Sequence, residues 1–217
     1  MVFSKIIQAG IFIEVPAISI DTAMKRISAL LEGGIRLIGI DIRHSEGLRI
    51  IEESVSRFAE RLIINANFVL DSDAARKAIL AGADIISTPY LIKGVLTTCN
   101  RYGKICIPGA LTATEVLKAI EGGANLVKLY PADLFGPGLL KAIKSPLPQA
   151  NLIPSAGVNL DNMAAWFRAG ASAVAIDGTF GIADEDDSMH FEEKIAMHAR
   201  QITKCFQDTT ASIQNQR

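Results

Sequence analysis

The chain has 217 residues, of which 49% are hydrophobic, and its formal net charge is −1. This size and composition suit a single domain over 1–217 with ample core-forming residues. The near-neutral charge predicts no nucleic-acid partner and no binding to an anionic membrane surface. No apolar run is long enough to span a bilayer and the N-terminus lacks a secretory pattern, so a cytoplasmic protein is expected. Three cysteines without metal-like spacing predict neither a disulfide framework nor a metal site.

A unit of helix, glycine and strand recurs along the chain, at 32–38, 81–86, 121–127 and 169–174. Glycine just past a helix supplies the left-handed conformation that other residues resist. The run that follows it is typical of a strand buried on both faces. Such units predict parallel strands that are joined by helical crossovers.

In chain order, about eight strands alternate with helices. The strands are expected near 11–15, 36–42, 62–66, 84–88, 104–107, 125–129, 151–154 and 173–176. The helices are expected near 20–33, 46–60, 71–81, 90–101, 112–122, 138–144, 160–170 and 188–207, with a capping box at Thr112 and Glu115. This pattern predicts an α/β fold, a single compact (β/α)8 TIM barrel, with a doubly wound sheet as the alternative. The polar tail from Gln207 is expected to fray.

Lys128 lies within the predicted strand 125–129, where an ammonium group is costly unless it is paired, exposed or neutral. A lysine that loses its proton easily is a nucleophile toward ketones. The alternative is a structural lysine whose head reaches solvent at the strand end. In a barrel, active-site residues lie at the C-terminal ends of the strands, and Lys128 falls there.

The segment Val-Lys-Leu-Tyr-Pro-Ala at 127–132 resembles the Lys-x-Phe-Pro-Ala segment of class I aldolases acting on 2-keto-3-deoxy-6-phosphogluconate and 4-hydroxy-2-oxoglutarate. Further segments similar to that family lie at 33–36, 87–89, 108–112, 134–143 and 154–158. The resemblance implies a lyase in which Lys128 forms a Schiff base with a 2-oxo acid, without metal or cofactor. Cleavage of the C3–C4 bond would then release pyruvate and an aldehyde. The resemblance also implies a homotrimer.

The resemblance assigns substrate-binding roles as well. Arg43 would bind the pyruvate carboxylate, because a guanidinium fork matches a planar carboxylate, although a surface arginine is the alternative. Pro89 and Tyr130 would wall the pocket, with barrel packing as an equal explanation. The backbone after strands seven and eight would cradle a phosphate, with contributions from Ala156, Gly157, Gly178 and Thr179.

The chain departs from the family at the position of its proton-transferring glutamate, where Gly39 stands. Asp41 points to the same side of that strand and is the predicted catalytic replacement, paired with Arg43 or Arg36 in the alternative. Glu14, near the end of the first strand, is the second candidate.

Two further departures concern the pocket. Phe68 replaces a substrate-contacting threonine, which narrows the pocket, and Asp177 replaces a glycine of the phosphate cradle. Pointing inward, Asp177 would repel phosphate, and pointing outward it would be a harmless loop residue. The chain is therefore expected to be a Schiff-base aldolase that cleaves a 2-keto-3-deoxy-6-phospho sugar acid or 4-hydroxy-2-oxoglutarate, with an unphosphorylated substrate left open. The alternative is a catalytically altered or silent relative that binds a different 2-oxo acid.

Overall fold

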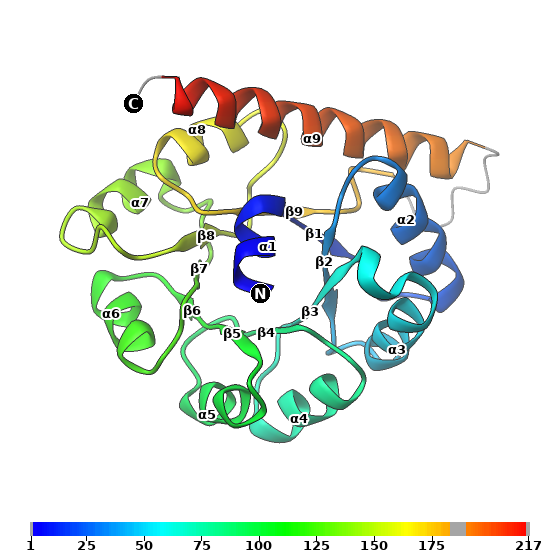
Figure 1. The fold of residues 1–217 in the computed structure, drawn as a ribbon, viewed down its shortest axis with the longest axis horizontal. Coiled ribbons are helices and arrows are strands. Elements are labelled where there is room, and N and C mark those ends of the chain that lie inside the picture. The colour runs from blue at the N-terminus through cyan, green and yellow to red at the C-terminus, as the bar shows by residue number, and fades with distance from the viewer. Residues whose placement is uncertain (1, 183–189, 216–217) are drawn as a thin grey trace.

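A ring of parallel strands surrounded by helices forms the molecule (Figure 1), and the computed structural model describes residues 2–182 and 190–215. The strands are β1 (Ile11–Val15), β2 (Leu37–Asp41), β3 (Ile63–Asn67), β4 (Ile85–Ser87), β5 (Ile105–Ile107), β6 (Gly109–Ala110), β7 (Val127–Leu129), β8 (Leu152–Pro154) and β9 (Val174–Asp177). The helices are α1 (Val2–Ala9), α2 (Ile20–Glu32), α3 (Gly47–Phe58), α4 (Ser72–Leu80), α5 (Lys93–Tyr102), α6 (Ala113–Glu121), α7 (Gly136–Lys144), α8 (Met163–Arg168) and α9 (Phe191–Gln214), with a 3-10 turn η1 (Ala59–Arg61).

The ring closes through two parallel sheets. One has the strand order β5-β4-β3-β2-β1-β9, and the other has the order β6-β7-β8. Strands β5 and β6 are separated only by Pro108, which has no N–H group to donate to a ladder. On the opposite side, Ser155 just after β8 forms a parallel bridge with Ala175 of β9. The predicted (β/α)8 barrel is therefore confirmed, and the doubly wound alternative does not hold.

The glycines after the helices have the backbone conformation that the sequence predicts. Gly34, Gly82, Gly123 and Gly170 have φ values between +94° and +104°. A side chain is strained in this region, so glycine ends each helix and lets the next strand begin at once. The predicted capping box of α6 is also present, because Glu115 N–H donates to Thr112 Oγ1 while the Glu115 carboxylate accepts from Thr112 N–H.

Strand alternation divides the side chains into two sets. The outward set packs between strands and helices, whereas the inward set of the N-terminal half forms a second apolar cluster. Its members come from strands all around the ring: Phe12, Leu37, Ile85, Ile107, Leu126, Ile153 and Ala175. One step further toward the C-terminal ends, the inward positions carry Glu14, Asn65, Ser87 and Lys128. The barrel interior is thus apolar at the bottom and polar at the top.

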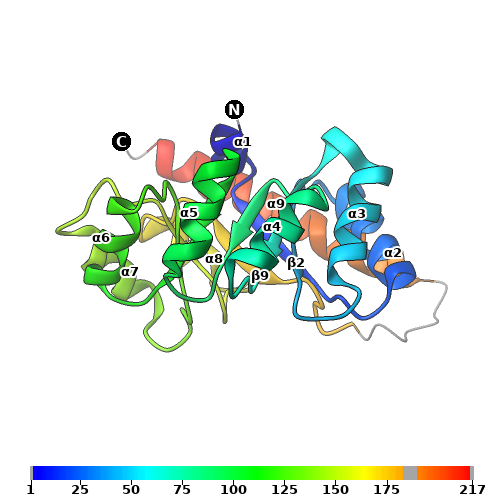
Figure 2. The same ribbon diagram turned by 90° about the horizontal axis from the view of Figure 1, so that it is seen from below.

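Helix α1 closes the apolar end of the barrel, and the sequence analysis did not predict it. Figure 1 shows α1 across the ring, and Figure 2 shows it at the opposite edge from the segment leaving β9. Ile6 of α1 is fully buried in the inner apolar cluster. The helix therefore seals the end of the barrel that holds the inner apolar cluster.

Helix α9 runs along the outside of the barrel beside α2 and α8 (Figure 1). It continues to Gln214, so the predicted fraying from Gln207 is wrong. Thr209 is buried and Phe206 packs against Phe167 in a tilted arrangement, with 5.1 Å between ring centroids. No helix within the described ranges 2–182 and 190–215 has the length and apolarity needed to cross a bilayer.

Candidate active site

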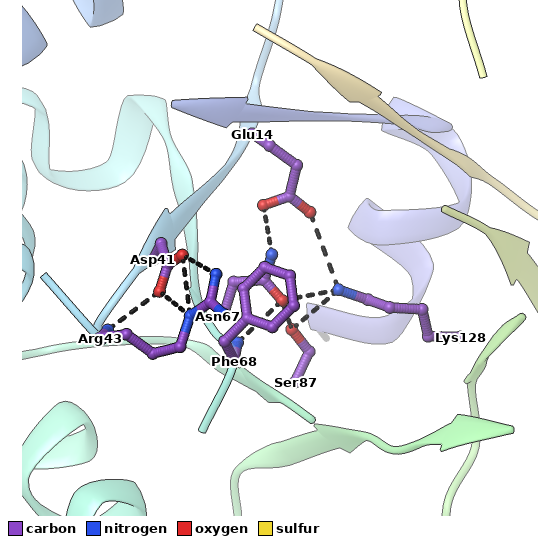
Figure 3. A network of polar contacts seen from close by, with 7 residues as sticks. All are labelled: Glu14, Asp41, Arg43, Asn67, Phe68, Ser87 and Lys128. Atoms are coloured by element: carbon purple, nitrogen blue, oxygen red, sulfur yellow. Dashed lines mark hydrogen bonds and ion pairs between the residues drawn. The ribbon is translucent and has the colours of Figure 1, made fainter. Parts of the chain in front are cut away.

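Lys128 belongs to a polar network inside the barrel, in which its Nζ points toward Glu14, Asn67 and Ser87 (Figure 3). The residue is 5% exposed, so the alternative in which its head reaches solvent does not hold. Its Nζ donates to Asn67 Oδ1 at 2.7 Å and to Ser87 Oγ at 3.4 Å, and it lies 3.8 Å from Glu14 Oε1. Strands β7, β3, β4 and β1 supply these four side chains, all from inward positions.

Burial decides the protonation of this lysine. Desolvation lowers the pKa of Lys128 below its usual value, and the negative charges of Glu14 and Asp41 offset that effect only in part. At a given pH, a larger fraction of this amine is therefore neutral than in an exposed lysine. A neutral amine is the form that attacks a carbonyl carbon.

Asn67 fixes the geometry around the amine. Its Oδ1 accepts from Lys128 Nζ, from Ser87 Oγ at 2.9 Å and from Phe68 N–H at 3.0 Å. Its Nδ2 donates to Glu14 Oε2 at 2.6 Å, so both ends of the amide are assigned by their partners. Asn65 Nδ2 in turn donates to Ser87 Oγ at 2.9 Å. Neither Asn67 nor Ser87 was assigned a catalytic or binding role from the sequence, although both occupy inward positions near the C-terminal ends of their strands.

Glu14 and Gly39 lie side by side on β1 and β2, where the parallel register pairs them. A Cβ atom at position 39 would lie 2.8 Å from Glu14 Cδ and closer still to Oε2. The Glu14 carboxylate therefore occupies the space that a side chain at position 39 would fill.

Asp41, the predicted catalytic carboxylate, contacts Arg43. The Arg43 side chain donates to both Asp41 oxygens, at 2.6 to 3.1 Å, and Arg43 N–H also donates to Oδ1. Burial alone would raise the pKa of Asp41, but these hydrogen bonds and the Arg43 charge bring the pKa below its usual value. The Arg43 guanidinium also stacks over the Phe68 ring, 3.8 Å from its centroid. Glu14, the second candidate, is thus the carboxylate that approaches the Lys128 amine.

A cavity of about 440 Å³ opens above this network, a size that suits a small metabolite. Among the predicted site residues, Asp41, Tyr130, Ala156 and Gly157 line it, whereas Arg43, Pro89, Gly178 and Thr179 are not among its lining residues. The remaining lining residues are Glu14, Val15, Pro16, Ala17, Ile18, His44, Asn67, Phe68, Ser155, Ala175 and Asp177. Among the residues that the structure describes, the lining therefore includes three carboxylates and neither lysine nor arginine.

The loop after β9 uses the two amides that the sequence analysis assigned to a phosphate cradle. Gly178 N–H donates to Glu14 O at 2.8 Å, and Thr179 N–H donates to Asp177 Oδ1 at 2.9 Å. In this conformation both groups are satisfied by the protein itself. The Asp177 carboxylate binds Thr179 N–H as the oxygen of an anionic ligand would.

Buried Arg26 of α2 binds the backbone carbonyl groups of the same loop. Its Nη1 donates to the carbonyl of Gly178 at 2.7 Å and to that of Thr179 at 3.3 Å. Its guanidinium lies 5.0 Å from the centroid of the Phe191 ring. The loop is therefore fixed on both sides.

Among the described residues, no three His, Cys, Asp or Glu side chains gather closely enough to hold a metal ion.

Comparison with known proteins places this chain in a family. The family model "KDPG and KHG aldolase" matches residues 4–193. The chain is 29% identical over 157 residues to the 2-dehydro-3-deoxy-6-phosphogalactonate aldolase of Escherichia coli K12, and the matched region covers 72% of this chain and 77% of that protein. It is 30% identical over 200 residues to the 2-dehydro-3-deoxy-phosphogluconate aldolase of Pseudomonas aeruginosa, where the match covers 85% of this chain and 90% of that protein.

Solved structures agree with this result. A solved structure described as native KDPGal superposes on this chain with a TM-score of 0.84 at 25% identity, and the superposition covers 93% of this chain and 96% of that chain. A Legionella pneumophila KDPG aldolase, solved with pyruvate captured as a covalent carbinolamine, has the same fold, with a TM-score of 0.75 at 21% identity and coverage of 90% and 91%. The chain therefore belongs to the KDPG and KHG aldolase family.

Proposed function

We propose that this protein is a class I aldolase, a lyase that cleaves a 2-oxo acid carrying a hydroxyl group at C4 into pyruvate and an aldehyde. The observation that carries the proposal is the buried amine of Lys128 beneath a cavity of about 440 Å³, with its pKa lowered by desolvation. Its family relatives, which are named as aldolases of 2-dehydro-3-deoxy phospho sugar acids, support the same reaction class.

The amine is held ready for attack at C2 of the substrate. Asn67 Oδ1 and Ser87 Oγ orient Nζ, so little rotation has to be lost when the new bond forms. The resulting iminium withdraws the electrons of the C3–C4 bond, which removes the need for a separate cofactor in the proposed reaction.

The charge of the cavity favours a substrate whose aldehyde half carries no phosphate. Asp177 lies on the cavity wall, where its carboxylate binds Thr179 N–H, whereas the charge of Asp41 is balanced by Arg43. Two unit charges 4 Å apart repel by about 1 kcal/mol in water and by about 4 kcal/mol near a protein surface. A phosphate beside Asp177 would be destabilised by an energy of that order, whereas a neutral polyol would not.

We also propose a cytoplasmic homotrimer, as the family resemblance implies. Apolar side chains exposed in the loops after β4 and β7 support an interface between copies, because Tyr90 is 57%, Leu134 65% and Phe135 58% exposed. Light scattering during size-exclusion chromatography measures the assembly, and a monomer at micromolar concentration would contradict the trimer.

Trapping with borohydride tests the aldolase proposal directly. Incubation with pyruvate and borohydride should add one reduced pyruvate per chain, and peptide mapping should place it on Lys128. Lys128→Ala should abolish the adduct. Lys144→Ala is the matched control, because the pKa of Lys144 is also lowered by burial although it lies outside the cavity. An absent adduct in the native protein, or one that persists in Lys128→Ala, would refute the proposed function.

A further inference from the structure

We infer that Glu14 is the group that transfers protons during this reaction, and that Gly39 is the residue that admits its carboxylate to the site. The inference rests on the proposed Schiff-base function of Lys128. Three features of the site support it. The Glu14 carboxylate occupies the space beside Gly39, its Oε1 atom has no hydrogen-bond partner among the described residues, and that atom lies beside the Lys128 amine.

Packing explains why position 39 is glycine. Gly39 has an ordinary strand conformation, because its φ lies outside the left-handed range, so backbone freedom is not the reason. The three nearest atoms to a Cβ at this position all belong to Glu14: Oε2, Cδ and Oε1. Glycine weakens a strand interior and often marks a close approach of another group. Here that group is a carboxylate from the neighbouring strand.

The two oxygens of Glu14 have different surroundings. Oε2 accepts a hydrogen bond from Asn67 Nδ2, which anchors the carboxylate. Oε1 is buried and has no hydrogen-bond partner among the described residues, and it lies 3.8 Å from Lys128 Nζ. A buried oxygen without a partner is costly, and such groups in native proteins call for an explanation. A hydroxyl group formed at the substrate carbon attached to Nζ would supply the missing partner.

The other titratable side chains around the cavity are placed less well for this role. Asp41 is bound by Arg43, Asp177 is bound to Thr179 N–H, and His44 lines the cavity from the loop after β2. Glu14 alone among the lining carboxylates forms an ion pair with the Lys128 amine. The geometry therefore selects Glu14 over the predicted Asp41.

The proton balance of the reaction can be written with this one carboxylate. Lys128 Nζ attacks C2, and Glu14 carries the amine proton to the carbonyl oxygen, which forms the carbinolamine. Glu14 relays a proton from solvent to that hydroxyl, so water leaves and the iminium remains; hydrolysis of the pyruvate iminium later returns this proton to solvent. Glu14 then takes the proton of the C4 hydroxyl while the C3–C4 bond breaks, so the aldehyde leaves and an enamine remains. The same proton is returned to C3, and water hydrolyses the pyruvate iminium. C3 is only two bonds from Nζ, so it lies within reach of a group that approaches Nζ.

Exchange of the pyruvate methyl protons isolates this step from cleavage. In deuterated water the native protein should exchange these protons, as followed by proton NMR, because the enamine forms and is reprotonated at C3. Glu14→Gln should lower the exchange rate by about 10²–10⁴-fold, the usual contribution of a positioned acid or base. Borohydride should still trap pyruvate on Lys128 in this variant at long incubation. Glu53→Gln, which changes a partly exposed carboxylate on α3 outside the cavity lining, is the matched control and should exchange at the native rate.

A swap of the two positions tests the shared space. Glu14→Gly should be slow in exchange, and the double variant Glu14→Gly/Gly39→Glu should exchange at least about tenfold faster, because the carboxylate returns from the neighbouring strand. Failure of trapping in the native protein would refute the proposed function itself. Native trapping combined with native exchange in Glu14→Gln would overturn the inference. A folded double variant with no gain over Glu14→Gly would also overturn it.

Discussion

Replacement of Gly39 by alanine places one methyl group against the Glu14 carboxylate. The new Cβ would lie 2.8 Å from Glu14 Cδ and closer still to Oε2, a separation that Cβ atoms in folded proteins do not adopt. Because Gly39 and Glu14 are paired in register on adjacent strands, the backbone cannot shift without disturbing the ladder between β1 and β2. The Glu14 side chain must therefore move.

The magnitude follows from what this movement breaks. Overpacking in a well-packed interior costs about 1–3 kcal/mol. Displacement of the carboxylate also breaks its 2.6 Å hydrogen bond from Asn67, and a hydrogen bond to a charged group contributes about 1.5–3 kcal/mol. Because both costs apply, we expect Gly39→Ala to lower the free energy of unfolding by about 2.5–6 kcal/mol. Turnover should fall by about 10- to 100-fold, since about 1.4 kcal/mol corresponds to a factor of ten.

A double-mutant cycle in urea provides the assay. In a Glu14→Ala background the three nearest neighbours of the new Cβ are removed, so Gly39→Ala should cost less than about 0.5 kcal/mol there. Gly138→Ala is the matched control, because a Cβ at Gly138 meets no atom within 4 Å and alanine favours a helix. An equal cost of Gly39→Ala in both backgrounds would refute the reasoning, because the clash would then not involve Glu14.

Three further predictions concern charge. In a pH series of borohydride trapping, the rate of pyruvate capture by Lys128 should rise with pH about a midpoint below 10.5. Glu14→Gln should move this midpoint to lower pH, because the Glu14 charge raises the pKa of the amine, and a shift to higher pH would contradict this. Asp177→Gly should raise the ratio of kcat/KM for a phosphorylated substrate to kcat/KM for its unphosphorylated analogue about fivefold, since about 1 kcal/mol of repulsion is removed. An unchanged ratio would contradict a role of Asp177 in excluding phosphate. Arg26→Met should lower the free energy of unfolding, measured in urea, by about 2–4 kcal/mol, because the loop carbonyls after β9 lose a charged donor. Lys25→Met, a change at an exposed neighbour, should alter it by less than about 0.5 kcal/mol, and an equal effect of the two variants would contradict the role of Arg26 in holding this loop.

The barrel could be predicted from the sequence because its signals are local. Glycine after a helix, an apolar strand and the capping box at Thr112 each depend on a few neighbouring residues. Helix α1 could not be predicted in the same way, because it has only eight residues and is held by burial of Ile6 in the barrel. The last turns of α9 look polar, yet Phe206, Thr209 and Ile213 recur on one face and pack against the barrel.

The site divides in a similar way. Lys128 could be identified because a lysine within a buried strand is unusual in any context. The choice between Asp41 and Glu14 could not be made, because it depends on the register of β1 against β2 and on the contact between Arg43 and Asp41. The amides of Gly178 and Thr179 matched a phosphate cradle in sequence. Their partners, Glu14 O and the Asp177 carboxylate, become visible only in three dimensions.

A crystal structure of the protein soaked with pyruvate is the most direct test of the central claim. The account predicts continuous density from Lys128 Nζ to C2 of pyruvate, with Glu14 Oε1 within hydrogen-bonding distance of the adduct and Asp41 still bound to Arg43. Pyruvate bound beside an unmodified Lys128, or an adduct from which the Glu14 carboxylate has turned away, would contradict it.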